Sequence, residues 1–320
     1  MKQENDLPET LHEAVTYFAD PDVALQFMVK MRWPDGVVKC PRCNSTRVNF
    51  TAKRRVWTCE DCPKRRQFSI KVGTIMEDSA IGLDKWIVGM WLITSAKNGI
   101  SSYELHRALG ITQKSAWFLG HRIRFALHNG SMEKMSGTCE VDESWIGGSA
   151  RFMHKAKKQR VMKGCQNTAL TPVMGLLERG TREKASRIKL QIIRSTKRAE
   201  LHGHVRKYVL KGAEVQTDAL FAYRGLDADY THKVVDHAVA YVQNGVHTNG
   251  LENFWSLLKR TIKGTYVNVE PFHLFRYLDE QAFRFNERKD DDQGRFLTAV
   301  QGITGKRLTY RKLTGMVGDN

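Results

Sequence analysis

The sequence lacks the features that mark a secreted or membrane-bound protein. Its first ten residues, MKQENDLPET, contain no basic segment followed by an apolar one, so no secretory signal is predicted. The longest apolar-dominated run, at 86–96, is far too short to cross a membrane. Six cysteines in 320 residues are too few for a disulfide scaffold. We therefore expect a globular cytoplasmic protein with no membrane partner.

Acidic residues are scarce relative to basic ones. The chain has 34 Asp and Glu against 51 Lys and Arg, a formal net charge of +17. This excess favours a polyanionic partner, with nucleic acid as the first candidate. An acidic membrane surface is the alternative, but no basic amphipathic anchor is evident. No glycine-rich phosphate-binding loop is evident, so no nucleotide cofactor is expected.

Apolar spacing and turn residues divide the chain into five parts. These are a helical segment at 1–36, a cysteine-rich segment at 37–80, a helical region at 81–130, a region of strands and helices at 137–290, and a tail at 291–320. In the third part, a short helix, a glycine turn and a longer helix make a helix-turn-helix pattern. Gln113, Lys114 and Trp117 of the longer helix would enter the DNA major groove.

The fourth part alternates between strand and helix patterns. Strands are predicted at 138–146, 173–177, 187–194, 214–217 and 231–235, and helices at 197–211, 249–263 and 271–287. The last helix should bury a face with Phe272, Phe275, Leu278 and Phe283. This mixture places the chain in the α/β (α+β) class.

Four cysteines form two closely spaced pairs. Cys40 and Cys43, then Cys59 and Cys62, make two C-x2-C motifs with fifteen residues between them. This spacing is typical of a closed, structural Zn2+ site with four thiolates, here on a zinc ribbon. Redox motifs or two disulfides are the alternatives, but no thioredoxin-like pattern accompanies them. The ribbon's basic residues would contact DNA phosphates or simply face solvent: Lys53, Arg54, Arg55, Lys64, Arg65 and Arg66.

Three acidic residues stand out by context. Asp142 lies inside a predicted strand, Asp218 follows a short strand, and Glu252 lies in the first turn of a helix. Carboxylates brought together repel one another, and hard divalent cations such as Mg2+ or Mn2+ are their natural partners. Each also has an ordinary interpretation. Asp142 could lie at an exposed strand edge, Asp218 could cap a short helix, and Asn249 with Glu252 could form a capping box.

Several long motifs occur in a characteristic order. They are RWPDG at 32–36, CPRC at 40–43, QFSI at 67–70 with GT at 73–74, VDESWIGG at 141–148, TD at 217–218, HTN at 247–249, ENFWSLLK at 252–259 and FRFN at 283–286. With them the chain resembles the DDE transposases of bacterial insertion sequences, in the zinc-ribbon group related to Merlin elements. The resemblance covers nearly the whole chain.

The resemblance implies a ribonuclease H-like core with a mixed five-stranded sheet, preceded by the zinc ribbon and the helix-turn-helix region. Asp142, Asp218 and Glu252 match the family's three acids, which hold two Mg2+ ions, with Asp142 contacting both. Some members use Asn as the third residue, so Asn249 is the alternative to Glu252. Lys259, two helical turns beyond Glu252, matches a basic residue that faces the DNA.

The implied activity is DNA transposition on double-stranded DNA. The protein would bind the terminal inverted repeats of its element, cut the strand to free a 3′-hydroxyl, and join that hydroxyl to target DNA as a homo-oligomer. A basic segment after the first catalytic strand, with Lys155, Lys157, Lys158 and Arg160, would contact the DNA. The alternatives are a DNA-binding regulator with an inert core and a two-metal nuclease or resolvase. The localisation implied is the bacterial cytoplasm, with the nucleoid.

Overall fold

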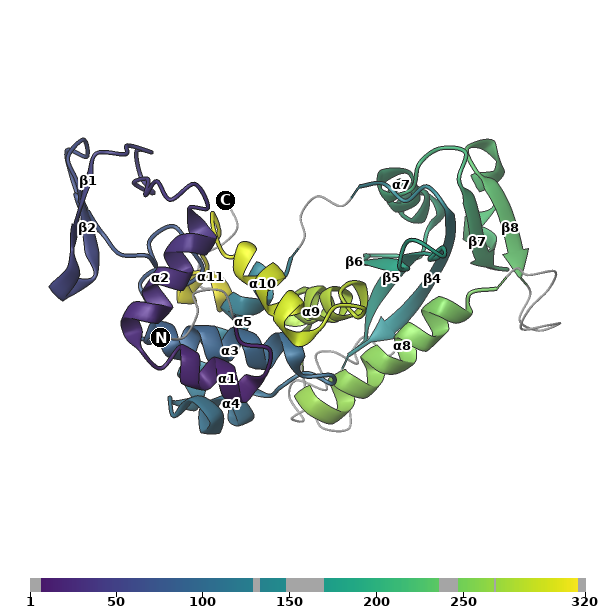
Figure 1. Cartoon of the computed structure of the whole chain (residues 1–320). Coiled ribbons are helices and arrows are strands. Elements are labelled where there is room, and N and C mark those ends of the chain that lie inside the picture. Colours follow the sequence, from purple (N-terminus) through teal and green to yellow (C-terminus); the bar gives the residue numbers. More distant parts are fainter. Residues whose placement is uncertain (1–6, 129–132, 148–169, 236–246, 268, 316–320) are drawn as a thin grey trace. The chain divides into compact units, whose positions relative to one another are not determined.

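The computed structural model describes residues 7–128, 133–147, 170–235, 247–267 and 269–315. The chain divides into two compact units, one made of Met1–His128 with Asp290–Asn320, the other of Asn129–Lys289 (Figure 1). The sequence pattern set 291–320 apart as a tail. In the structure the described part of this segment, 291–315, belongs instead to the N-terminal unit.

The first unit is largely helical. Its helices are α1 (Leu11–Tyr17), α2 (Pro21–Arg32), α3 (Leu83–Ser95), α4 (Ser102–Leu109), α5 (Gln113–Ala126), α10 (Asp292–Gln301) and α11 (Tyr310–Leu313). Phe296 of α10 is buried, and its ring centroid lies 5.8 Å from that of Phe27 and 4.9 Å from that of Trp91. Because aromatic rings bury large apolar areas, this contact explains why the C-terminal residues join the N-terminal core.

The predicted helix-turn-helix elements are present as α4 and α5. Ser101 forms a capping box with Glu104 at the start of α4, and Gly110 ends that helix in the left-handed conformation. Thr112 accepts a hydrogen bond from the backbone N–H of Ser115 and so caps α5. Helices α3, α4 and α5 pack against one another. Local capping signals therefore set these boundaries.

The cysteine-rich segment is a three-stranded antiparallel sheet. Its strands are β1 (Val48–Thr51), β2 (Val56–Cys59) and β3 (Gln67–Phe68), in that order. The sequence pattern predicts two short strands at 47–50 and 55–57, which correspond to β1 and β2, but it does not predict β3, which is only two residues long. Trp57 of β2 stacks on Phe68 of β3 with ring centroids 5.7 Å apart, so this small sheet has an aromatic core.

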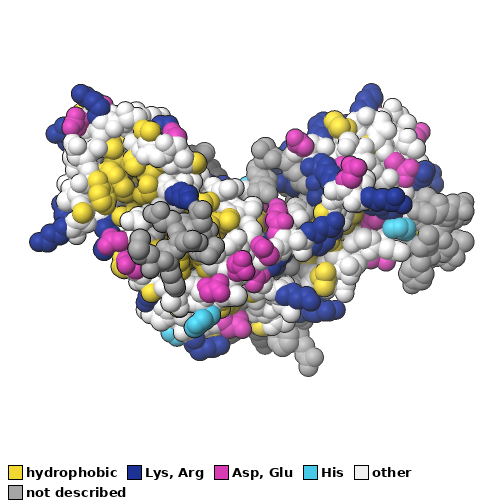
Figure 2. Space-filling model, viewed as in Figure 1, with side chains coloured by type: hydrophobic (Ala, Val, Ile, Leu, Met, Phe, Trp, Pro, Cys, Tyr) yellow, Lys and Arg dark blue, Asp and Glu magenta, His cyan; other side chains and the backbone are white. Residues whose placement is uncertain are grey.

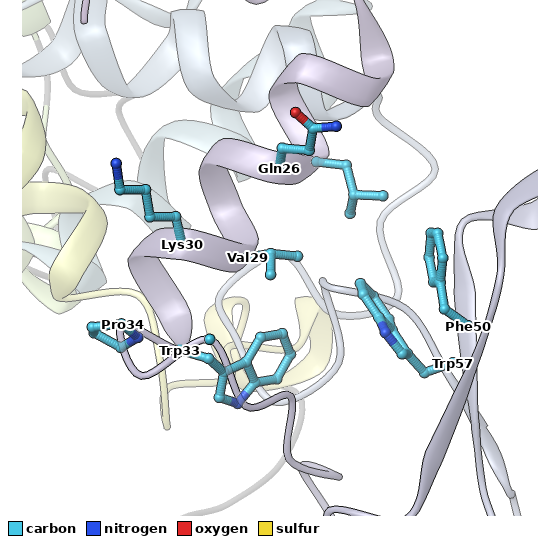
Figure 3. Close-up of a pocket in the computed structure, with 9 residues that line it drawn as sticks. Gln26, Val29, Lys30, Trp33, Pro34, Phe50 and Trp57 are labelled. Carbon is cyan, nitrogen blue, oxygen red and sulfur yellow. The ribbon is translucent and has the colours of Figure 1, made fainter. Parts of the chain in front are cut away.

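An apolar groove lies between α2 and the ribbon. Figure 2 shows hydrophobic side chains gathered on this face, and Figure 3 shows Val29, Trp33, Phe50 and Trp57 turned toward the same space. The groove has a volume of about 440 Å³. Two of its lining residues, Trp33 and Trp57, contact each other, with ring centroids 6.0 Å apart.

The second unit is built on a mixed five-stranded sheet. Its strands are β4 (Thr138–Ile146), β5 (Thr171–Glu178), β6 (Arg187–Ile192), β7 (Glu214–Asp218) and β8 (Thr231–Val235). The order is β6-β5-β4-β7-β8, in which β4 pairs with β5 antiparallel and with β7 parallel. All five predicted strands are present, and the sheet is consistent with a ribonuclease H-like core. The first strand, β4, lies at the centre.

Two helices cover opposite faces of this sheet (Figure 1). Helix α7 (Arg198–Tyr208) packs on the face that carries Cys139 and Val141 of β4. Helix α8 (Asn249–Thr261) packs on the other face, against Ile146 of β4. Because side chains alternate along a strand, Glu140, Asp142 and Ser144 point to the α8 face.

The predicted helix at 271–287 has a different buried face from the one expected. A 3₁₀ turn (Pro271–His273) precedes α9 (Leu274–Asn286), and Leu278 and Phe283 are buried. Phe272 and Phe275 are exposed, at 56% and 41%, so their predicted burial was wrong. The buried stripe of α9 begins at Leu274, and Phe275 lies about 100° around the helix from it. Along the described parts of the chain, no helix has the length and apolar character to cross a membrane.

Candidate active site and zinc ribbon

The four predicted zinc ligands come together. The Sγ atoms of Cys40 and Cys62 are 3.6 Å apart, and those of Cys43 and Cys59 are 3.5 Å apart. A tetrahedron with metal–sulfur bonds of about 2.3 Å has sulfur–sulfur edges of about 3.8 Å. These separations are far longer than a disulfide bond, so the four thiolates fit one Zn2+ ion.

Backbone N–H groups beside the first cysteine pair favour the thiolate form of Cys40. Burial raises the pKa of Cys40, but hydrogen bonds from the backbone N–H groups of Arg42 and Cys43 outweigh it and lower that pKa to about 7. The thiolate is the form that binds a metal. Asn44, directly after this pair, has a φ of 60°, which turns the chain back so that the N–H of Cys40 bonds to the carbonyl of Ser45.

Asp142 lies on the central strand, facing α8. It is half-buried and pairs across the sheet with Gly175 of β5. Trp255 of α8 lies over that glycine, where a Cβ atom would stand 2.8 Å from the indole ring. The indole Nε1 of Trp255 donates a hydrogen bond of 2.9 Å to Oδ2 of Asp142. The helical pattern predicts core packing for at least one of Phe254 and Trp255; both are buried, and Trp255 makes this polar contact as well.

The other two acids lie close enough to influence Asp142. Asp218 is the last residue of β7, which runs parallel to β4 and ends at the level of Asp142. Glu252 is exposed on the first turn of α8. Burial raises the pKa of Asp142 above its ordinary value, and the negative charges of Asp218 and Glu252 raise it further, against the hydrogen bond from Trp255. Carboxylates whose charges repel one another in this way are suited to binding a divalent cation.

The three carboxylates are less closely gathered than the cysteines. Among the described residues, only the four cysteines bring three or more possible ligand atoms within 4.8 Å of one another. Glu252 has a long, exposed side chain, so rotation about its χ angles can move its carboxylate relative to Asp142. Asp142 and Asp218 lie at the same level of neighbouring strands, while the distance of the Glu252 carboxylate from them depends on its side-chain rotation.

The helix-capping roles considered for Asp218 and for Asn249 with Glu252 are only partly present in the structure. Asp218 accepts a hydrogen bond of 3.1 Å from the backbone N–H of Leu220, which forms a local turn. The capping box of Asn249 and Glu252 is absent, since the N-cap of α8 is Thr248 and Asn249 already lies inside the helix. Asn249 and Lys259 are both exposed on α8, as Glu252 is. The three residues share one side of the helix.

One acid of the second unit was not singled out from the sequence. Glu143 follows Asp142 and accepts a hydrogen bond from the hydroxyl of Tyr223, which lies beyond Asp218. Burial, together with the charges of Asp142 and Asp218, raises the pKa of Glu143 to about 7, against the hydrogen bond from Tyr223. Its position beside Asp142 in the sequence is the signal that could have identified it.

The predicted DNA-contacting residues have different surroundings. Gln113 donates a hydrogen bond of 2.9 Å to Ser102 across the turn. Lys114 is exposed, with its Nζ 5.0 Å from the centre of the Tyr310 ring. The rings of Trp117 and His121 have their centroids 4.5 Å apart. The basic segment with Lys155, Lys157, Lys158 and Arg160 lies outside the described residues.

Two of the ribbon's basic residues are engaged within the protein. Arg55 forms a 2.6 Å ion pair with Asp22 of α2, and Arg66 donates hydrogen bonds to the carbonyls of Cys59 and Glu60. Lys53 and Arg54 occupy the turn between β1 and β2 and are exposed. Exposed cations at a strand turn can bind a phosphate at low cost in desolvation.

Comparison with known proteins gives two family matches. Residues 134–286 match the ISXO2-like transposase domain, and residues 20–65 match the transposase zinc-ribbon domain. A protein in transposable element ISH50 of Halobacterium salinarum is 27% identical over 256 residues, 74% of this chain and 81% of that protein. A transposase-like protein of Haemophilus influenzae is 27% identical over 103 residues, 32% of this chain and 83% of that protein. The chain therefore carries an ISXO2-like transposase domain that follows a transposase zinc-ribbon domain.

Proposed function

We propose that the chain is an active DNA transposase that binds the terminal inverted repeats of its element and catalyses Mg2+-dependent strand cleavage and strand transfer. The observation that supports the proposal is that Asp142, Asp218 and Glu252 all lie on the α8 side of the sheet, near enough for their charges to interact. Burial raises the pKa of Asp142, and the negative charges of Asp218 and Glu252 raise it further. Such a cluster has little use in a structural role, because charged groups near one another in a half-buried site are costly unless a cation joins them.

Asp142 and Asp218 would hold the cation, with Glu252 as third ligand and Asn249 as its alternative. When bound, Mg2+ or Mn2+ would polarise the phosphodiester and stabilise the charge that develops during cleavage. Trp255 orients the carboxylate of Asp142 through the Nε1 hydrogen bond. Lys259, exposed two turns along α8, would bind a DNA phosphate beside the acids.

DNA recognition would be divided between positioning and sequence reading. Lys53 and Arg54 on the ribbon would contact phosphates, and α5 would read bases with Gln113, Lys114 and Trp117. Pairing two transposon ends would require a homo-oligomer on DNA. The bacterial source, the relation to Merlin elements and the cytoplasmic, nucleoid-associated location stay predictions.

A cleavage assay tests the proposal. Purified protein is incubated in Mg2+ with DNA that contains the element's ends, and strand cutting and joining are followed on gels. We expect cutting at the ends and joining of the freed 3′-hydroxyl, both abolished by Asp142→Asn with end-binding retained. Binding without cutting in the wild-type protein would support a regulator instead. Cutting of branched DNA without preference for the ends would support a nuclease or resolvase.

A further inference from the structure

A buried polar network joins the three elements that carry the candidate acids. Arg179 directly follows β5, and its side chain lies on the α8 face of the sheet. Its Nε donates a 2.8 Å hydrogen bond to Oε1 of Glu140 on β4, and its Nη2 donates a 2.7 Å bond to Oε1 of Gln216 on β7. The same Nη2 donates to the backbone carbonyl of His247, also at 2.7 Å, just before α8.

The second carboxylate oxygen of Glu140 holds the start of α8. Oε2 accepts a 3.0 Å hydrogen bond from the backbone N–H of Leu251. The N-cap residue Thr248 makes no side-chain capping bond, so Glu140 supplies the negative partner at this helix end. Helix and strand meet closely here, since a Cβ atom on Gly250 would lie 2.8 Å from Oε2 of Glu140.

The network has a regular relation to the acids. Glu140 lies two residues before Asp142, and Gln216 two residues before Asp218, so each pair points to the same face of its strand. Leu251 directly precedes Glu252. Glu140 and Gln216 are 1% and 2% exposed, so these hydrogen bonds are shielded from water and hold their geometry.

We propose that Arg179 is a positioning residue which, through Glu140, Gln216 and the backbone of His247, locks the first turn of α8 against β4 and β7 and so sets the spacing of the three carboxylates. This inference rests on the proposed function, because it concerns the same site. Partners of metal ligands typically change metal affinity or activity by about 10- to 100-fold when they are mutated. A role in folding alone would leave metal binding unchanged in the folded protein.

The test uses the full-length, zinc-loaded protein. Mn2+ binding is followed by the electron paramagnetic resonance signal of the free ion, and the part lost in Asp142→Asn is assigned to the acid site. Amide hydrogen exchange at 249–255 reports the order of the first turns of α8. We expect Arg179→Gln to weaken Mn2+ binding about 10- to 100-fold and to speed exchange at 249–255, with DNA end-binding unchanged. Arg179→Lys should recover part of both losses, since it keeps the charge.

A matched control is Arg187→Gln. Arg187 also pairs with a buried glutamate of this sheet, Glu178, but lies on β6 away from the acids. This variant should lose stability and keep its Mn2+ affinity. Equal Mn2+ affinity in Arg179→Gln and Arg187→Gln would overturn the inference. If Arg179→Gln does not fold, the Gly250→Ala variant is measured instead, since it adds only a methyl group against Glu140. An unchanged Mn2+ affinity in Gly250→Ala would also overturn the inference.

The two proposals fail differently. A wild-type protein that cleaves DNA, together with an Arg179→Gln variant that binds Mn2+ and cleaves equally well, overturns the positioning role alone. A wild-type protein that neither binds Mn2+ through Asp142 nor cleaves DNA overturns the proposed function, and the positioning role with it.

Discussion

The indole Nε1 of Trp255 and the Oδ2 atom of Asp142 are joined by a 2.9 Å hydrogen bond between helix α8 and the central strand. The bond links the helix of one candidate ligand, Glu252, to the side chain of another. It forms because Gly175 leaves room for the indole ring to lie against the sheet. We expect Trp255→Phe to keep most of the packing but to lower strand cleavage about 10-fold, as the carboxylate loses its fixed orientation.

The control for Trp255→Phe is the neighbouring Phe254→Leu. Phe254 is buried and packs on Phe285, with ring centroids 5.5 Å apart. Its ring has no group that could donate a hydrogen bond to Asp142. Both variants should lose about 1–3 kcal/mol of stability. Only Trp255→Phe should reduce cleavage per folded molecule, as measured in a single-turnover assay. Equal losses in both would show that packing alone matters.

The third metal ligand can be identified by a pair of substitutions. If Glu252 is the ligand, Glu252→Gln abolishes cleavage because the amide loses the charge that binds Mg2+. Asn249→Ala should then change stability by less than about 0.5 kcal/mol, since Asn249 is an exposed helix residue that caps nothing. Cleavage of pre-cut and uncut ends, with thermal unfolding, checks this. A reversed ranking would make Asn249 the ligand.

The ribbon should contain one Zn2+ ion. We expect Cys59→Ser to release it and unfold the ribbon, because metal binding and folding are coupled in small metal domains. The sheet of the second unit should stay folded. Elemental analysis, with hydrogen exchange at 138–146 as the probe of that sheet, measures both effects. A wild-type protein free of zinc after purification under reducing conditions would contradict the prediction.

Two exposed cations of the ribbon should contribute to DNA affinity. The double substitution Lys53→Ala with Arg54→Ala should weaken binding equally for all DNA sequences and reduce the slope of log affinity against log salt by about 2. Arg47→Ala is the control, since Arg47 is exposed but already paired with Asp61. Fluorescence anisotropy at several salt concentrations gives the slopes. An unchanged slope in the double variant would remove these residues from the interface.

Glu178 should make the second unit sensitive to acid. Burial would raise the pKa of Glu178, but hydrogen bonds from Arg187 and from the backbone N–H groups of Ser136 and Gly137 lower it from 4.5 to about 2. Because the pKa of Glu178 is lower in the folded protein than in the unfolded chain, its ionised carboxylate stabilises the folded state at pH values above the unfolded pKa of 4.5. This stabilisation is lost as the pH falls from there toward the folded-state pKa of about 2. The contribution is about 2–3 kcal/mol at neutral pH.

Urea titrations of wild type and Glu178→Gln at a series of pH values measure this contribution. The difference in the free energy of unfolding should be largest above about pH 5 and shrink toward pH 2. A difference that stays constant across that range would show that the carboxylate's charge is unimportant.

The sequence alone determined the features that depend on nearby residues. Strand alternation marked Thr138–Ile146, a cap at Ser101 or Ser102 and another at Thr112 marked two helices, and cysteine spacing indicated the four-thiolate site. These signals are local because capping, alternation and metal knuckles each involve a few consecutive residues. The order of the acids along the chain also came from the sequence.

Only the tertiary structure decided the features that rest on distant contacts. Phe296 packs with Phe27 and Trp91, which places the C-terminal segment in the N-terminal unit. Arg179 reaches Glu140 and Gln216 across the sheet, although nothing in its neighbouring residues distinguishes it from the other arginines of this basic chain. Side-chain direction and burial arise when elements far apart in sequence pack together, so local periodicity could not predict the exposed Phe272 or the contact that holds α8 to β4.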